Sequence, residues 1–216
     1  SKLEINRLND FIYYKELQKN IENFIFDKLF YNILLFSLFS IIWISLLGFG
    51  SPLLIVSGIF FGKWTGTLVS VVSIATGALI LYSIASFFFK DLVHSILKRK
   101  FSKYINLFKK NEFYYFFIFR FVGGLGIPFG LQNILPVIFN MGKFNYFLSS
   151  VLGFIPSFFV WNTIGSGLNE YIEKSDSFSF VDLILSKEIF LPILLFIFLI
   201  LSSLIIKKKI FDAQNN

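Results

Sequence analysis

Apolar residues along the chain gather into long unbroken runs. Four of these runs come close to the roughly 20 residues that a membrane-spanning helix needs, at residues 29–47, 64–89, 144–168 and 188–206. Two further apolar segments do not fit this pattern, because residues 52–62 are too short and residues 113–141 are interrupted by glycine and proline. Backbone that is not helical at membrane depth is tolerated only inside protein or beside a watery cavity. We therefore expect both segments to be re-entrant.

The composition agrees with this pattern. The chain has 216 residues, of which 56% are hydrophobic and 15% charged, whereas an ordinary soluble domain has roughly 45–50% apolar and 25% charged residues. We expect one membrane domain over residues 29–206, preceded by a cytoplasmic or interfacial segment at residues 1–28 and followed by a basic cytoplasmic tail at residues 207–216. The polar segments are too short for a second, soluble domain.

Charged residues between the apolar runs predict the orientation of the helices. Residues 91–112 mix lysine and arginine with apolar residues at loosely helical spacing, as an amphipathic helix on the inner membrane surface does. Lysines also follow the last run, whereas the loop over residues 169–187 is mainly acidic. Because basic loops stay on the cytoplasmic side, we expect both termini inside, with residues 29–47 and 64–89 crossing in opposite directions.

This topology gives the two re-entrant segments opposite directions. Residues 52–62 would enter from the outside, and residues 113–141 from the cytoplasm. The predicted fold is an all-α integral membrane protein, a helical bundle of about four spanning helices plus two oppositely facing re-entrant helical hairpins. Such an arrangement is an inverted repeat, in which broken helices meet near the midplane and form the binding site.

The residue inventory excludes several chemistries. The chain has no cysteine and a single histidine, His94, and the only acids between Lys28 and Glu170 are Asp91 and Glu112. Thiol chemistry is therefore excluded, and a metal site is not expected because its ligands are lacking. No combination of nucleophile, base and oxyanion donors can be assembled in the apolar segments. We expect neither an enzyme nor a cofactor.

The stretch “FIFRFVGGLGIPFGLQN”, residues 117–133, carries the sharpest signal. An arginine within the membrane costs roughly 2.5–3.5 kcal/mol on insertion, so Arg120 requires compensation. One interpretation is that its planar guanidinium faces a groove and binds an anionic head group, as arginine binds phosphate. The alternative is that Arg120 extends to the cytoplasmic interface or binds backbone carbonyls at the end of the broken segment.

Helix-breaking residues follow Arg120 at once: Gly123, Gly124, Gly126, Pro128 and Gly130. They resemble a dinucleotide loop only superficially, because such a loop follows a strand in a βαβ unit. Glycine instead lets the backbone turn sharply and expose N–H groups to an anion, or serves as a purely structural turn. The neighbouring amides, Gln132 and Asn133, either line a substrate path or form hydrogen bonds between helices.

Two stretches together resemble a known family. “SPLLIVSGIFFGKWTGTLVSVVSIATGALILYSIA”, residues 51–85, has a proline, then G-x-x-F-G-x-x-x-G, then a glycine and a tyrosine in the next helix. “FRFVGGLGIPFGLQNILPVIFNMGKFNYFLSSVLGFIPSFFVW”, residues 119–161, has an arginine, a Pro-Phe pair, a polar residue and later G-x-x-P. Their order and spacing over residues 48–165 resemble the VTT domain of the DedA-like, SNARE-associated Golgi protein superfamily.

The resemblance implies a fold and a set of site residues. Members of this family have two re-entrant hairpins that face each other in a small helical bundle, and they are associated with movement of lipids or lipid-linked carriers. Its bacterial branches are associated with envelope maintenance and proton-dependent phenotypes. The positions that match the family pattern are Pro52, Gly58 and Gly62 in the first hairpin, Arg120, Pro128, Gln132 and Asn133 in the second, and Gly153 and Pro156 beyond it.

Two departures from the family pattern affect the expected mechanism. The DedA branch usually has a glutamate in the first hairpin, where this chain has only apolar residues and Ser51. That branch also tends to have a second arginine, where this chain has its glycine run. A proton-coupled mechanism that depends on the glutamate is therefore not expected. The eukaryotic-like and plainer bacterial branches, which also lack the acid, are more similar.

These observations predict a multi-pass protein of the bacterial inner membrane that moves an anionic phospholipid or lipid-phosphate carrier between leaflets. Its expected partners are membrane lipids, chiefly anionic ones, with no nucleic acid, and a homo-oligomer stays open. The expected substrate-binding residues are Arg120, Gln132 and Asn133. Two alternatives stay open: a proton-coupled transporter of small solutes or ions, which needs a titratable group at the midplane, and a membrane scaffold that transports nothing.

Overall fold

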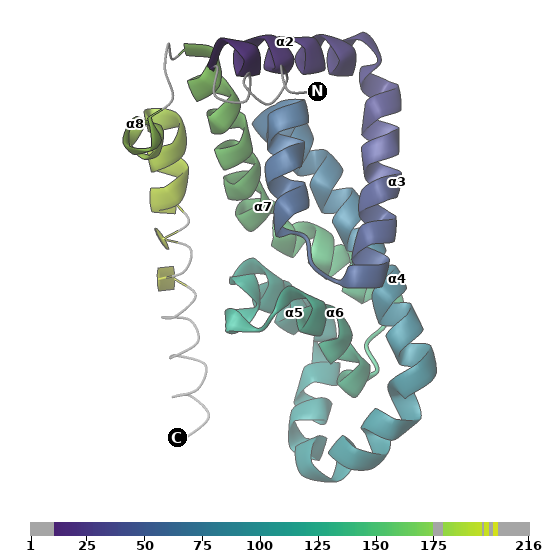
Figure 1. Cartoon of the computed structure of the whole chain (residues 1–216). Coiled ribbons are helices and arrows are strands. Elements are labelled where there is room, and N and C mark those ends of the chain that lie inside the picture. The colour runs from purple at the N-terminus through teal and green to yellow at the C-terminus, as the bar shows by residue number, and fades with distance from the viewer. Residues whose placement is uncertain (1–10, 175–178, 196, 199–200, 203–216) are drawn as a thin grey trace, which may run out of the picture.

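Every element in the described part of the chain is helical, which confirms the predicted all-α class. The computed structural model describes residues 11–174, 179–195, 197–198 and 201–202. Its elements are α2 (Phe11–Asp27), α3 (Leu29–Leu47), α4 (Ser51–Lys110), α5 (Glu112–Phe121), the 3₁₀ helix η1 (Gly123–Gly126), α6 (Phe129–Ile134), the 3₁₀ helix η2 (Leu135–Phe139), α7 (Lys143–Lys174) and α8 (Phe180–Leu185). Residues 187–195 are also helical. Figure 1 shows their arrangement.

Three described helices are long and apolar enough to cross a membrane: Leu29–Leu47, Ser51–Phe89 and Lys143–Lys174. They contain the first three predicted spans, whereas the fourth, residues 188–206, lies partly outside the described residues. The predicted amphipathic helix at 91–112 is not a separate element, because the helical backbone of α4 continues through Lys110. The residues of the predicted tail, 207–216, and the first ten residues of the chain lie outside the described part.

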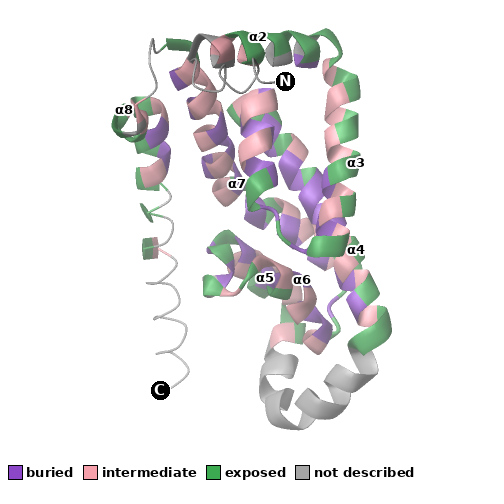
Figure 2. Ribbon diagram, viewed as in Figure 1, coloured by how far each residue is buried: buried purple, intermediate pink, exposed green. Residues whose placement is uncertain are grey.

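The bundle is apolar on its outer surface and partly polar inside, as a bundle in lipid requires. Large apolar side chains project outward, including Phe30 and Phe87, which are 81% and 83% exposed. The buried polar and charged residues are Ser40, Ser57, Thr67, Ser70, Ser73, Arg120, Gln132, Asn133, Ser149, Ser150 and Asn162. Figure 2 shows the buried residues gathered on the faces of α4 and α7 that meet each other. Contact with lipid explains the exposed apolar side chains on the outer faces of the helices, because lipid tails are themselves apolar.

The helix α4 folds back on itself at Gly62. Gly62 has a φ of +72°, a left-handed conformation that glycine adopts without steric cost. The Ser57 hydroxyl donates a hydrogen bond to the Gly66 carbonyl at 3.1 Å, although residues nine apart in a straight helix lie about 13.5 Å apart. Residues 51–61 and 63–89 are therefore antiparallel arms. The predicted re-entrant segment 52–62 is one arm of a hairpin rather than a whole one.

The reversal at Gly62 makes two predicted spans run in the same direction. Ser45 in α3 donates a hydrogen bond to the Gly77 carbonyl at 3.3 Å, and a Cβ on Gly48 would lie 3.3 Å from Leu81 further along α4. The prediction that residues 29–47 and 64–89 cross in opposite directions is therefore wrong. The hydropathy pattern missed one reversal, because residues 51–61 are too short to count as a span.

The N-terminal segment consequently lies at the end of the bundle opposite to the basic part of α4. Gln18 in α2 donates a hydrogen bond to the Asn169 carbonyl near the end of α7, at 3.1 Å. Figure 1 shows α2 across the end where α3 begins and α7 finishes, with the last part of α4 at the other end. The prediction that residues 1–28 and 91–112 lie on the same side of the membrane is therefore wrong. Residues 1–28 carry equal numbers of acidic and basic side chains, so their charge gives no orientation signal.

The second broken segment, residues 113–141, forms a hairpin of its own. Glu112 at its start accepts hydrogen bonds from the Gly142 backbone N–H at 3.0 Å and from the Asn145 amide at 2.6 Å, so the two ends of the segment meet. Helix α5 leads away from Glu112, the chain reverses direction at residues 122–128, and α6 and η2 return toward Gly142. A Cβ on Gly48 would lie 3.2 Å from the Gly130 Cα, so the chain reversals at 48–50 and 122–130 pack against each other.

Candidate functional site

Arg120 lies inside the protein, in the last turn of α5. Only 1% of this residue is exposed, and it is among the largest fully buried side chains of the described chain. Its guanidinium binds side-chain oxygens rather than backbone carbonyls. The alternative in which Arg120 extends to the cytoplasmic interface is therefore not the arrangement that the structure has. The arginine sits at the centre of the packed hairpin, where its charge is most costly.

The two predicted amides bind this arginine directly. Nη1 of Arg120 donates to Oε1 of Gln132 at 3.2 Å, and Nη2 donates to Oδ1 of Asn133 at 2.7 Å. Both amides belong to α6, whose start at Phe129 follows directly on Pro128. Gln132 in turn donates from Nε2 to the Ile127 carbonyl at 2.6 Å, which fixes the amide orientation. The structure thus brings the three predicted binding residues together.

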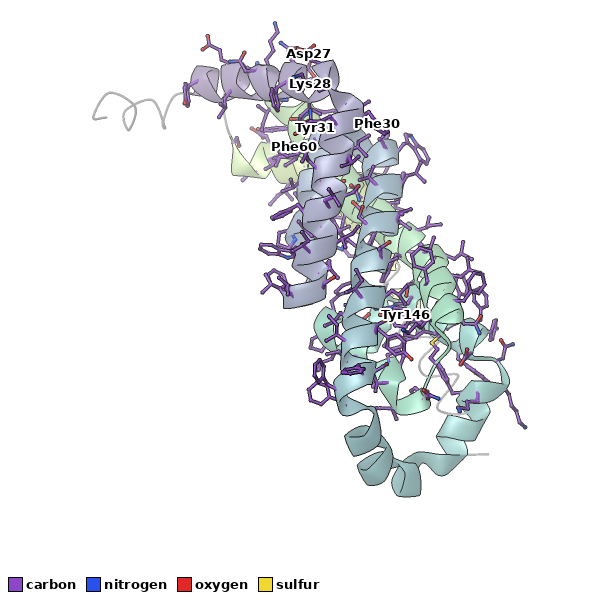
Figure 3. The ribbon with its side chains drawn as sticks, turned by 90° about the vertical axis from the view of Figure 1, so that its right-hand side faces the viewer. Asp27, Lys28, Phe30, Tyr31, Phe60 and Tyr146 are labelled. Carbon is purple, nitrogen blue, oxygen red and sulfur yellow. The ribbon has the colours of Figure 1, made fainter. Side chains whose placement is uncertain are left out.

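A tyrosine that the sequence pattern did not single out completes the polar contacts. Nη2 of Arg120 also donates to the Tyr146 hydroxyl at 3.0 Å. This hydroxyl lies 3.2 Å from the carbonyl oxygens of Ala78 and Asn133, and the Tyr146 ring stacks on Tyr82 with centroids 4.5 Å apart. Figure 3 shows Tyr146 in the crowded interior of the bundle. Tyr146 therefore joins α7, α4 and the α5–α6 hairpin at the arginine.

Aromatic rings surround the guanidinium. The Cζ atom of Arg120 lies 4.7 Å from the ring centroids of both Phe116 and Phe154, 5.6 Å from Phe129 and 5.7 Å from Tyr146. Rings within about 6 Å attract a cation through their electron-rich faces, by up to roughly 2 kcal/mol when the pair is desolvated. The aromatic side chains of this region thus stabilise the charge of Arg120, a role that the composition alone did not indicate.

No carboxylate contacts the guanidinium in the described part of the chain. The ion pairs found there join Lys174 to Glu170 and Glu188, at the far end of α7, and the side chains that hydrogen-bond to Arg120 are all neutral. Two donors also lack a partner although they are buried, namely Nε of Arg120 and Nδ2 of Asn133. The site therefore has a positive charge that no carboxylate compensates, together with N–H donors that form no hydrogen bond.

The predicted hairpin glycines have distinct structural roles. Gly123, Gly124 and Gly126 have φ values of +72°, +73° and +82°, so they make the turn that returns the chain from α5 to α6. A Cβ on Gly124 would collide with the Gln132 amide, and a Cβ on Gly153 would lie 2.5 Å from the Arg120 Cβ. The second contact shows why α5 approaches α7 closely enough to bury the arginine.

The remaining predicted hairpin residues lie at separate places in the bundle. Gly130 packs against the Gly48 carbonyl, and Gly58 against the Asn162 backbone, where a Cβ would collide. Pro52 occupies the first turn of α4, a position that suits proline because the N–H there has no partner within the helix. Pro156 lies inside α7. Within the described residues no cluster of histidine, cysteine, aspartate or glutamate could hold a metal ion.

Tyr146→Phe is expected to destabilise the protein. The substitution removes the hydroxyl that accepts from Arg120 Nη2 and leaves one of the two N–H groups of this nitrogen without an acceptor, while the other still donates to Asn133. An unsatisfied buried donor costs about 1–3 kcal/mol. Thermal unfolding in detergent measures this loss. Tyr114→Phe is the control, because Tyr114 lies in α5 with 51% of its surface exposed. If the two variants unfold at the same temperature, the Tyr146 hydroxyl does not support the arginine.

The fold and the site define the class of protein. A bundle of long apolar helices with an apolar surface and a buried polar centre is a helical membrane protein. The sequence model of the VTT domain family matches residues 30–167, which is more than half of the chain, so the protein belongs to the VTT domain family. This confirms the family predicted from the two sequence stretches. No curated protein and no solved structure matches the chain significantly.

Proposed function

We propose that this protein moves an anionic phospholipid, or a lipid-phosphate carrier, from one membrane leaflet to the other. The observation that carries this proposal is the buried guanidinium of Arg120, which has no carboxylate partner in the described chain and is held where the two chain reversals meet. A buried charge of this kind is expensive unless a ligand or a partner compensates for it. A phosphate group supplies the missing negative charge.

An internal repeat supports the proposed transport architecture. A shift of 80 residues superimposes identical residues: Phe36 and Phe116, Phe39 and Phe119, Phe49 and Phe129, Gly50 and Gly130, Gly62 and Gly142, Lys63 and Lys143, Ser70 and Ser150, and Val71 and Val151. The same shift relates α3 to α5, residues 51–61 to residues 131–141, and residues 63–89 to α7. Inverted repeats of this size are typical of transporters whose substrate site lies at the repeat interface.

Contacts within the bundle agree with this repeat. Tyr146 stacks on Tyr82, and a Cβ on Gly66 would lie 2.5 Å from Oδ1 of Asn162. Under the shift of 80 residues, Tyr146 corresponds to Gly66 and Asn162 to Tyr82, so the two contacts are equivalent. The first proposed re-entrant hairpin then consists of α3 and residues 51–61 with its tip at 48–50, and the second has its tip at 122–128.

The two repeats differ at the position that bears the charge. The shift pairs Arg120 with Ser40, and Asn133 with Leu53. Ser40 is fully buried, and its hydroxyl has no hydrogen-bond partner within the described structure. The second repeat therefore supplies the cationic site, whereas the first has uncharged residues at the corresponding positions. A single arginine on one hairpin suits a substrate with one negative head group.

The proposed path keeps the head group in the protein and the acyl chains in the bilayer. In the observed arrangement the first tip, at 48–50, contacts Gly130, two residues after the second tip, and Arg120 is enclosed. Separation of the tips would let phosphate oxygens take the places of Gln132 and Asn133 around the guanidinium. The unused donors on Arg120 and Asn133 are ready for such oxygens. Movement down a gradient in this way requires neither a carboxylate nor a nucleotide.

The basic part of the chain supports a proposed orientation in a bacterial inner membrane. Residues 90–110 contain seven lysine and arginine residues, and they form the last part of α4, at the end of the bundle opposite α2. The positive-inside rule then places this end in the cytoplasm. Lys174, the last residue of α7, and α2 lie at the opposite end of the bundle.

Transport by lipid class tests the proposal. Liposomes are prepared with the native protein and with fluorescent phosphatidylglycerol or phosphatidylcholine in both leaflets, and a quencher that cannot cross the membrane is added outside. We expect inner-leaflet phosphatidylglycerol to become accessible faster than phosphatidylcholine, and neither lipid to move in protein-free liposomes. Equal rates for the two lipids would refute the anionic substrate. Absence of movement for both would favour the scaffold.

A further inference from the structure

A second group of charged residues lies far from Arg120, around a cavity at the other end of α7. The cavity has a volume of about 320 Å³ and lies between Lys63, the C-terminal half of α7 and the helical residues 187–195. Glu170, on its rim, is 17 residues further along α7 than Gly153, which contacts Arg120. At 1.5 Å per residue this separation is about 25 Å. The cavity is therefore distinct from the arginine site.

The rim of the cavity carries two lysines and two glutamates, but their charges are not equivalent. Lys174 forms ion pairs with both glutamates, at 3.6 Å to Glu170 and 2.9 Å to Glu188. The ion pairs in the described part of the chain include neither of the other two cationic rim residues, Lys63 and Lys187, although Lys187 adjoins Glu188 in the sequence. With Lys174 included, this end of the cavity has one positive charge more than negative, which favours an anion.

The floor of the same cavity is apolar and continues toward lipid. Phe159, Leu191, Pro192 and Leu195 line it, and Leu191 is 59% exposed. Trp64, next to Lys63, packs against Phe159 with ring centroids 4.8 Å apart in a tilted arrangement, and it is itself 68% exposed. Tryptophan concentrates at the boundary between head groups and acyl chains. A cationic rim above an apolar floor at such a boundary has the shape of a phospholipid, with its phosphate above and its chains below.

The walls of the cavity are held by close backbone packing rather than by mobile side chains alone. A Cβ on Gly167 would collide with the Glu188 carbonyl, so only glycine lets α7 approach residues 187–195 this closely. The ion pairs of Lys174 fasten the same two segments. The cavity is thus formed by close packing of two helical segments.

We propose that this cavity binds the phosphodiester head group of an anionic phospholipid, with the phosphate between Lys63 and Lys187 and an acyl chain against Leu191 and Leu195. The site would be open in the observed arrangement, in contrast to the enclosed Arg120. It would hold a lipid in the leaflet opposite to the basic part of α4. Binding there does not require that the protein moves lipid, so it stands whether or not the proposed function does.

Lipid binding to the purified full chain tests this inference. The protein carries Arg120→Gln so that the hairpin site does not contribute, and native mass spectrometry measures retention of phosphatidylglycerol and phosphatidylcholine. We expect Lys63→Gln combined with Lys187→Gln to weaken phosphatidylglycerol binding about 10- to 30-fold, since each lysine near a lipid phosphate contributes to affinity. The matched control is Lys143→Gln with Lys110→Gln, since both lysines are exposed at the other end of the bundle.

Four results would overturn the proposed lipid site. The first two are unchanged binding in the Lys63 and Lys187 double variant, and an equal loss of binding in the control. Equal retention of phosphatidylcholine would overturn the preference for an anionic lipid. Equally tight binding of soluble glycerophosphoglycerol would show that the apolar floor contributes nothing, which would also overturn the proposal. Both lysines are exposed, so their substitution is expected to leave the unfolding temperature unchanged.

Discussion

Arg120→Gln is expected to abolish stabilisation of the protein by anionic lipid while leaving the lipid-free protein folded. Glutamine keeps a polar group toward Gln132, Asn133 and Tyr146, so none of these neighbours is left in a purely apolar environment. It also removes a buried charge that has no carboxylate partner in the described chain, and this removal offsets the lost hydrogen bonds. What the variant loses is the fork that binds an oxyanion.

The measurement is the rise of the unfolding temperature when phosphatidylglycerol is added in detergent. A ligand at one hundred times its Kd stabilises the folded state by about 2.7 kcal/mol. We expect the unfolding temperature to rise accordingly with Arg120 present and not to rise in Arg120→Gln. Both proteins carry Lys63→Gln and Lys187→Gln, so that the second cavity does not contribute. If phosphatidylglycerol stabilises the variant as much as the protein that keeps Arg120, then Arg120 is not part of the binding site.

Two further substitutions at this position sharpen the comparison. Arg120→Lys keeps the charge but not the planar fork, and a lysine is a poor replacement where two parallel hydrogen bonds are formed. We expect it to recover only part of the lipid-dependent shift. Arg120→Leu leaves the amide oxygens of Gln132 and Asn133 unsatisfied, at a cost of about 1–3 kcal/mol each. Leucine should therefore destabilise the lipid-free protein, whereas glutamine should not.

Gly153→Val is expected to damage both stability and transport. A Cβ at this position would lie 2.5 Å from the Arg120 Cβ and 3.1 Å from the Phe117 carbonyl oxygen, so valine must push α5 away from α7. Overpacking of this kind typically costs about 1–3 kcal/mol. It also moves the guanidinium away from Tyr146. Unfolding in detergent and lipid movement in liposomes measure the two effects.

The control for Gly153→Val is Leu152→Val, one residue earlier in α7. Leu152 is 41% exposed, so its substitution introduces a similar side chain without contact to α5. We expect it to behave as the native protein does. If Gly153→Val also unfolds and transports normally, then close packing of α5 on α7 does not position the arginine, and the geometry of the site has no functional importance.

The position of the site could be predicted from the sequence because its chemistry is conspicuous against an apolar background. A single arginine in a phenylalanine-rich run needs compensation, and the following glycines and Pro128 require a turn. The two amides, Gln132 and Asn133, were assigned from the match to the family pattern, and the structure shows both of them bound to Arg120. Burial of the arginine could not be predicted, because it depends on Gly153, which lies in another helix.

Tyr146 and the direction of α4 were missed for different physical reasons. Tyr146 lies in an ordinary apolar run, and only the three-dimensional approach of α7 to α5 and α4 gives its hydroxyl a role. Gly62 stands four residues before Gly66, a spacing that also occurs where helices pack closely. Its left-handed φ and the reversal that follows are not visible in that spacing. The missed reversal then inverted the predicted side of α2.

Leaflet-to-leaflet movement of labelled phosphatidylglycerol, in liposomes that contain native protein or Arg120→Gln at matched incorporation, tests the central claim most directly. The Arg120 guanidinium is the buried cation that the described chain leaves without a carboxylate, and we propose it as the group that accepts the lipid phosphate. We predict rapid movement with the native protein and movement at the protein-free rate with the variant. Movement at the native rate in Arg120→Gln would contradict this role of the arginine.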